Sequence, residues 1–179
     1  MNAPLSPHPR AAAWIQRLGL EVLEGESGRW AGRFVSEVPH TESGRQDTTA
    51  CNAIYYLLEP ERPINAWHWL ASDDTHVLID GGPVEYIVVD PAGDVQRIVV
   101  DAETRPMISV PAGSHKALRL CDPDGFALVG SVVAPAWAPD RVRIEPPAHA
   151  RRPPWLDDAL MAELTTGVAS GHAHREPGA

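Results

Sequence analysis

The chain has 179 residues, 44% of them hydrophobic, which is enough for one globular domain with its own core. Its formal net charge of −9 argues against nucleic acid as a partner, because phosphate binding needs clustered positive charge. No apolar run is long enough to span a membrane and the N-terminus lacks a secretory pattern, so we expect a cytoplasmic protein without a membrane partner.

The N-terminal part predicts one helix and one strand. Residues 1–10 are polar and proline-rich, and we expect them to be flexible. A short helix is predicted from residue 11 to an end at Gly19, because apolar side chains recur at helical spacing (Ala11, Trp14, Ile15 and Leu18). A strand is predicted over 28–38, with Trp30 and Phe34 on one face unless a bulge intervenes, and a polar loop over 39–49.

From residue 52 onward the apolar runs are short, rich in β-branched and aromatic residues, and separated by turn sequences. The predicted strands are 52–59, 65–72, 74–82, 84–90, 95–101, 106–110, 115–120 and 126–135. The turn PAGD predicts that 84–90 and 95–101 form a hairpin. Many short strands, with too few helical segments for βαβ units, indicate an all-β sandwich or barrel domain over 11–147.

The composition changes after this domain. A helical extension is predicted over 148–167, with an amphipathic helix at 155–167 that follows two prolines and ends at Gly167. The tail 168–179 is predicted to be disordered, and its histidines, His172 and His174, are read as solvated.

Candidate functional residues occur first in AWHWLASDDTH. On a strand, His68 shares a face with Ala66 and Leu70, and Asp74 shares a face with His76. If these faces meet inside a barrel, two histidines and a carboxylate could bind a divalent metal or exchange protons. The alternative is that His68 packs in the core and the aspartate caps a turn.

The only lysine of the chain, Lys116, directly follows His115 after a PAG turn. The two side chains point to opposite faces of their strand, and the sequence leaves open which one faces inward. An inward lysine could hold a substrate carboxylate, act as a base or form a Schiff base. In the alternative, Lys116 is exposed and His115 is a packed residue at the rim, where it could contact substrate.

Three further side chains, Tyr56, Glu26 and Trp69, have less certain roles. Tyr55 and Tyr56 face opposite sides of their strand, and an inward Tyr56 could donate a proton or simply fill the core. Glu26 could contact a ligand at the barrel mouth or lie in an exposed turn. Trp69 is a candidate substrate contact, although with Trp67 it could instead form a dimer interface or pack under the C-terminal helix.

A series of motifs, in this order, resembles the small single-domain bacterial cupins of the DUF985 (cupin-5) type. They are IQRLGL, LEGESGRW, AIYYLL at 53–58, WHWLASDD at 67–74, VPAG at 110–113 and LVGSVVAPAW at 128–137. The resemblance covers residues 12–145. It implies a cupin double-stranded β-helix, or jelly-roll barrel, with a small-molecule site inside.

The resemblance also implies where a cupin would hold its metal. The usual ligand positions fall on Ala66, His68, Asp74 and Lys116, so one histidine is missing, the glutamate is shortened and the last histidine is a lysine. An ammonium has no lone pair for a metal. His68, Asp74 and His76 remain as an alternative set for iron, nickel, manganese or zinc.

These features favour a small-molecule enzyme that needs no cofactor. We expect acid–base chemistry on an anionic metabolite, namely isomerisation, epimerisation, cyclisation, dehydration or a lyase step, with His68 and His76 exchanging protons and Lys116 holding an oxyanion. The alternatives are a metal-dependent cupin oxygenase or lyase and a non-catalytic binding protein. The resemblance further implies a role in specialised metabolism and a homodimer.

Overall fold

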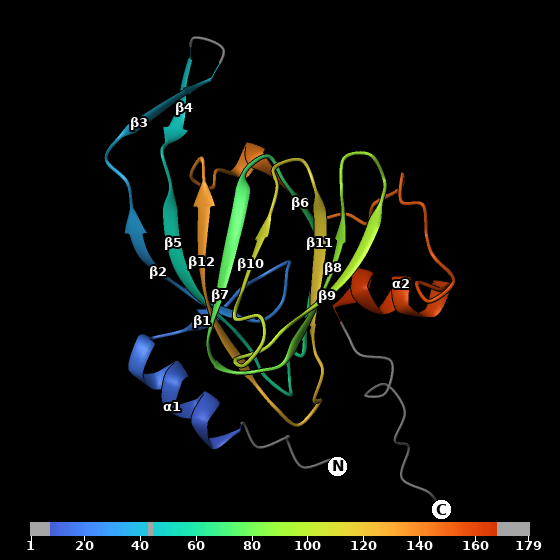
Figure 1. Cartoon of the computed structure of the whole chain (residues 1–179). Helices are drawn as coiled ribbons and strands as arrows, with labels where there is room; N and C mark the ends of the chain where they lie inside the picture. The colour runs from blue at the N-terminus through green and yellow to red at the C-terminus, as the bar shows by residue number, and fades with distance from the viewer. Residues whose placement is uncertain (1–7, 43–44, 168–179) are drawn as a thin grey trace, which may run out of the picture.

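Two antiparallel sheets face each other, with one short helix against the outer face of each (Figure 1). The structure is a computed structural model and describes residues 8–42 and 45–167. The larger sheet has the strand order β1 (Glu21–Val22), β2 (Arg29–Val35), β5 (Asn52–Leu58), β12 (Ala127–Ala134), β7 (Asp73–Gly81) and β10 (Met107–Val110). The smaller sheet has the order β13 (Val142–Arg143), β6 (Ile64–Leu70), β11 (His115–Leu120), β8 (Val84–Val89) and β9 (Val95–Val100). The predicted all-β jelly-roll barrel is therefore confirmed.

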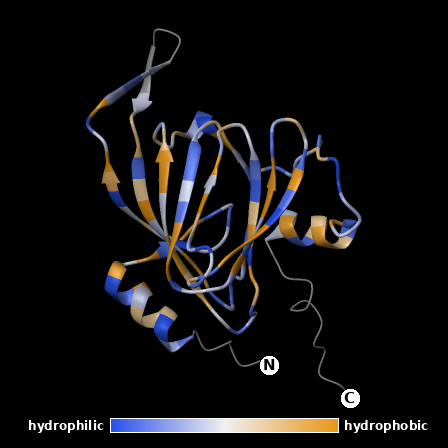
Figure 2. Ribbon diagram, viewed as in Figure 1, coloured by the Kyte–Doolittle hydropathy of each residue, from blue (hydrophilic) through white to orange (hydrophobic). Residues whose placement is uncertain are grey.

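The first helix, α1 (Pro9–Leu18), covers the outer face of the larger sheet. Bands of hydrophobic and hydrophilic residues alternate along it (Figure 2), and its apolar side packs against Leu57 and Leu128. Gly19 ends the helix as predicted, at a φ of 63° that suits glycine. The helix begins earlier than expected, because a proline is well tolerated in the first turn. Pro9 and Arg10 of the predicted flexible segment 1–10 are therefore helical, and residues 1–7 of it lie outside the described residues.

The second helix, α2 (Asp158–Thr166), covers the smaller sheet and begins three residues later than predicted. Asp157 caps it by accepting a hydrogen bond from the Leu160 amide at 2.9 Å, which fixes the start of the helix. Leu156 therefore lies in the preceding turn, yet it still packs with Leu164 and Trp67 on the outer face of the sheet. No described helix is long and apolar enough to cross a membrane. The predicted tail 168–179, with its histidines, lies outside the described residues.

The segment 39–49 is not the predicted loop. It forms the hairpin of β3 (Pro39–Glu42) and β4 (Arg45–Thr49), which projects away from the barrel in Figure 1. Backbone pairing holds these two strands, and a search for alternating apolar residues does not detect a polar hairpin. A bulge in β2 between Gly32 and Phe34 separates the faces of Trp30 and Phe34, so Phe34 is 55% exposed. A short 3₁₀ helix, η1 (Pro139–Arg141), precedes β13.

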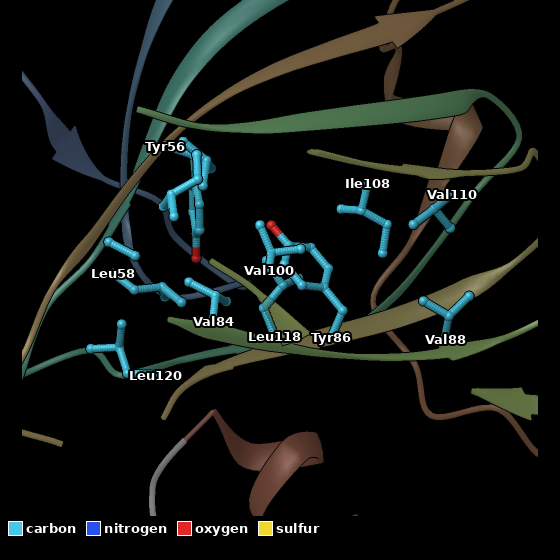
Figure 3. Close-up of a cluster of buried hydrophobic side chains, with 13 residues drawn as sticks. Tyr56, Leu58, Val84, Tyr86, Val88, Val100, Ile108, Val110, Leu118 and Leu120 are labelled. Carbon is cyan, nitrogen blue, oxygen red and sulfur yellow. The ribbon is translucent and has the colours of Figure 1, made fainter. Parts of the chain in front are cut away.

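Inward-facing side chains change from polar to apolar along the barrel. On β11 the inward positions run from Lys116 to Leu118 and Leu120, and on β7 they run from His76 to Leu78. Apolar side chains from both sheets point toward one another and fill one end of the barrel (Figure 3). This packed end forms a rigid floor for the polar residues at the other end.

Candidate functional site

The polar end of the barrel holds a cavity of ≈ 530 Å³, a volume typical of small-molecule sites. Both sheets contribute to its wall. The polar and aromatic lining residues are Glu24, Glu26, Trp30, Asn52, Tyr56, Asn65, His68, Asp74, His76, Lys116, Ser131 and Trp137. Aliphatic side chains complete the wall, so the cavity offers a few polar groups on an apolar background.

A buried ion pair lies inside this cavity. Lys116 points inward and is 2% exposed, so Lys116, and not His115, is the residue of this pair that faces the cavity. Its ammonium contacts the Asp74 carboxylate. The Ser131 hydroxyl donates to the other carboxylate oxygen, Asp74 Oδ1, at 2.9 Å. Burial alone would raise the pKa of Asp74, but His76 and Lys116 outweigh it and hold that pKa well below its usual range. Asp74 is therefore a carboxylate with all its strong partners in place.

His76 joins the ion pair to a tyrosine. Its Nε2 lies 3.2 Å from Asp74 Oδ2 and 3.2 Å from Lys116 Nζ, and its Nδ1 lies 2.9 Å from the Tyr86 hydroxyl. Burial lowers the pKa of His76, so the ring is neutral at pH 7. Tyr86 belongs to the site although the sequence favoured Tyr56 as the functional tyrosine. The signal for Tyr86 is its inward position on β8, beside the Lys116 strand, and this becomes visible only once the strand pairing is known.

His68 faces Lys116 across the adjoining strands, because the two residues are direct partners in the β6–β11 pairing. Its Nδ1 lies 2.9 Å from the Ala66 carbonyl, and a carbonyl can only accept, so Nδ1 carries the proton. Burial, aided by the charge of Lys116, lowers the pKa of His68 and keeps the ring neutral. Its Nε2 makes no hydrogen bond to any described residue and leaves a lone pair available in the cavity.

A bulge in β6 changes which residue before His68 on this strand faces inward, Asn65 or Ala66. The pairing shifts between Lys116 and Leu118, so Asn65 lines the cavity and Ala66 does not, contrary to simple alternation. The Asn65 amide donates to the Glu26 carbonyl at 3.1 Å and to Glu26 Oε2 at 3.4 Å. Glu26 thus reaches the cavity as predicted, with its carboxylate 3.9 Å from His68 Nδ1.

Tyr56 lines the cavity, but its hydroxyl has a structural partner. The hydroxyl donates to the Ser27 carbonyl at 2.9 Å and so holds the turn that carries Glu26. Gly28 packs directly against the ring, where an added Cβ would lie 2.2 Å from the phenolic oxygen. Burial raises the pKa of Tyr56 well above its ordinary value. This geometry supports a structural role for Tyr56 in place of the predicted proton donor.

Two predicted substrate contacts, His115 and Trp69, point away from the cavity. They line a separate surface pocket of ≈ 400 Å³ on the outer side of β6 and β11. There the Trp69 indole donates to the Gly113 carbonyl at 2.8 Å, and the Arg143 guanidinium lies 3.7 Å from the Trp69 ring. Strand alternation explains the displacement, because the inward positions are taken by Lys116 and His68. Trp67 is buried under α2, as one of the predicted alternatives has it, whereas Trp69 is part-exposed; the expected homodimer stays a prediction.

The residues predicted as metal ligands do not fit a divalent cation. Of His68, Asp74 and His76, the last two already contact the Lys116 ammonium, and a metal between them would meet a positive charge. His76 Nδ1 is also engaged with Tyr86, and no trio of ligand-type side chains within residues 8–42 and 45–167 could hold an ion.

The sequence profile described as "Cupin superfamily (DUF985)" matches residues 12–144. A hypothetical protein from Leishmania major has a similar structure, with a TM-score of 0.68 and 24% identity over 75% of this chain and 86% of that chain. A protein from Shewanella oneidensis gives a TM-score of 0.63 and 26% identity over 74% of this chain and 82% of that chain. No curated protein is significantly similar in sequence. The profile match spans most of the barrel, and the chain therefore belongs to the cupin superfamily, in its DUF985 family.

Proposed function

We propose that the protein is an enzyme that moves a proton on a small carbonyl compound inside the barrel, in an isomerase- or lyase-type reaction. The observation that carries this proposal is the pairing of a neutral His68, with a free Nε2, and the Lys116 ammonium directly across from it. A base and a fixed positive charge that lie side by side on one wall of the cavity, where both can contact one substrate, are the minimum for forming an enolate.

His68 is the proposed base. Its Nε2 would take a proton from the carbon next to the substrate carbonyl, and the electron pair of that C–H bond would move onto the carbonyl oxygen. The imidazolium formed can return the proton to another carbon, or to the other face of the same carbon, which gives isomerisation or epimerisation. If a group on the neighbouring carbon leaves instead, the same step begins a lyase reaction.

Lys116 is the proposed oxyanion donor. An ammonium has three N–H donors, and Asp74 and His76 can take two of them, which leaves one for the substrate oxygen. Since Asp74 already balances the charge of Lys116, a neutral carbonyl gains only a hydrogen bond, whereas a developing enolate gains an ionic one. The donor thus favours the transition state over the ground state.

Exchange of substrate hydrogen for solvent deuterium tests this proposal. A panel of small carbonyl compounds is incubated with the protein in D₂O, and loss of the α-proton NMR signal is followed. We expect His68→Gln and Lys116→Met each to lower the exchange rate by about 10²-fold or more, the usual contribution of a base or an oxyanion donor.

His115→Gln is the matched control, because this histidine lies on the same sheet but faces the outer pocket. Its exchange rate should equal that of the wild type. Equal rates in wild type and His68→Gln for every compound that binds would contradict the enzyme proposal and leave a ligand-binding cupin.

A further inference from the structure

The charges around the cavity point to a substrate that is positively charged. We infer that Glu26, with Glu24 beside it, binds an ammonium group of the substrate. This inference rests on the proposed function only in placing the substrate in the same cavity, and it changes the anionic metabolite that the sequence suggested.

The first step is a balance of the charged side chains that line the cavity. Among the described residues these are Glu24, Glu26, Asp74 and Lys116. Asp74 and Lys116 form a buried pair and cancel one another. The cavity histidines are neutral, so the two glutamates remain as negative charges. An anionic substrate would meet net repulsion here, whereas a cation would be attracted.

The second step is that Glu26 is held in a fixed position, while one of its carboxylate oxygens is free to bind a ligand. Its side chain is 19% exposed, and Asn65 holds one carboxylate oxygen and the main-chain carbonyl. The other oxygen, Oε1, has no hydrogen-bond or ion-pair partner among the described residues, and neither does the Glu24 side chain. Burying part of a carboxylate without a cationic partner costs free energy, and a ligand with a positive group would remove that cost.

The third step is that an unbonded nitrogen of a buried side chain that lines the cavity marks the place of the ligand. His68 is 3% exposed, lines the same cavity, and leaves Nε2 unbonded, while its Nδ1 lies 3.9 Å from Glu26 Oε2. A substrate over His68 therefore lies between the carboxylate of Glu26 and the ammonium of Lys116. The positive group of the substrate would face Glu26, and its carbonyl oxygen would face Lys116.

Two tryptophans at the exposed edge of the cavity agree with this polarity. Trp30 and Trp137 line the cavity and are 37% and 49% exposed. The face of an indole ring attracts cations and disfavours anions. An ammonium compound can thus pass the tryptophans and reach the glutamates without meeting a positive side chain among the described lining residues.

Binding of three ring compounds of equal size tests the inference: cyclohexylammonium, cyclohexanol and cyclohexanecarboxylate. Affinities are measured at neutral pH by saturation-transfer NMR titration. We expect the cation to bind roughly tenfold more tightly than the alcohol, because one hydrogen bond to a charged group is worth at least that factor. The carboxylate should bind most weakly.

Glu26→Gln should abolish the preference for the cation, whereas Glu21→Gln, which removes the same charge from an exposed residue outside the cavity, should preserve it. Equal affinities, tighter binding of the carboxylate, or no measurable binding of the cation would each overturn the inference. These outcomes are independent of deuterium exchange, so an active enzyme that prefers anions would refute the cation subsite and leave the proposed function standing.

Discussion

Replacing Lys116 by methionine removes one half of the buried ion pair and leaves the Asp74 carboxylate in the barrel. The side chains of Lys116 and Asp74 are 3% and 4% exposed, so water cannot take over the role of the ammonium. Ser131 and His76 remain as partners, but neither brings a full positive charge. We therefore expect a large loss of stability from this single change.

The magnitude follows from the burial of the pair. Breaking a buried ion pair by removing one partner costs about 3–5 kcal/mol. For a domain of this size, each kcal/mol lowers the melting temperature by roughly 2–4 °C. Lys116→Met should thus melt roughly 10 °C below the wild type. In Lys116→Met/Asp74→Asn neither charge is left alone, and part of the loss should be recovered.

The loss of stability in Lys116→Met should also depend on pH, and the titration of Asp74 decides whether it grows or shrinks as the pH falls. In the wild type the pKa of Asp74 is depressed, so its contribution is present above the unfolded value, about 3.9, and is lost as the pH falls below it. Without Lys116, burial pushes that pKa upward, and the trapped carboxylate is most costly at neutral pH. The stability gap between variant and wild type should narrow from pH 7 toward pH 4.

Urea unfolding followed by circular dichroism measures both effects. Arg152→Met is the control, since it breaks an exposed pair with Asp158 and should cost less than about 1 kcal/mol. If Lys116→Met is as stable as Arg152→Met at pH 7, the buried pair does not hold the site together and the reasoning fails.

Three further predictions concern the same cavity. Because burial lowers the pKa of His68 and His76, NMR titrations should give both a pKa below the ordinary value of about 6.5. The unfolding free energy should fall as the pH drops below about 6.5, because these two histidines take up protons more readily in the unfolded chain. Tyr86→Phe leaves a buried histidine nitrogen without its partner and should cost about 1–3 kcal/mol in urea unfolding, with a shifted ¹⁵N signal of His76 Nδ1. Gly28→Ala should cost clearly more than Gly25→Ala in the same assay, because both glycines have positive φ but only at Gly28 would the new Cβ meet a tyrosine oxygen, at 2.2 Å.

Alternation along the strands was enough to predict most of the barrel from sequence. All eight strands predicted from residue 52 onward are present, because apolar runs bounded by turn residues have few other ways to bury their side chains. The same rule placed Lys116 and His115 on opposite faces of β11, although only the packed structure shows which face is the inner one. The hairpin of β3 and β4 was missed because backbone bonds, and no apolar pattern, hold it.

The site was less predictable because it depends on departures from alternation and on pairing between distant strands. The β6 bulge brings Asn65 into the cavity in place of Ala66, and nothing in the local sequence signals that shift. Tyr86 joins His76 only through the register of separate strands in opposite sheets. The prediction that Trp69 contacts substrate in the cavity conflicts with strand alternation. Because its neighbour His68 faces inward, Trp69 faces the outer pocket.

The proposed reaction on carbonyl compounds needs a positive charge in the cavity, and Lys116 supplies it from the protein itself. A divalent cation and an ammonium both stabilise a developing oxyanion, but an ammonium acts through directed N–H donors and can be balanced by a single carboxylate. Asp74 supplies that carboxylate, and the Ser131 hydroxyl, which donates to its other oxygen, fixes its orientation. The pair is neutral as a whole and so adds little attraction for an anion in the ground state. In the proposed reaction, the negative glutamates would select the substrate, and Lys116 would act only on charge that appears during the reaction.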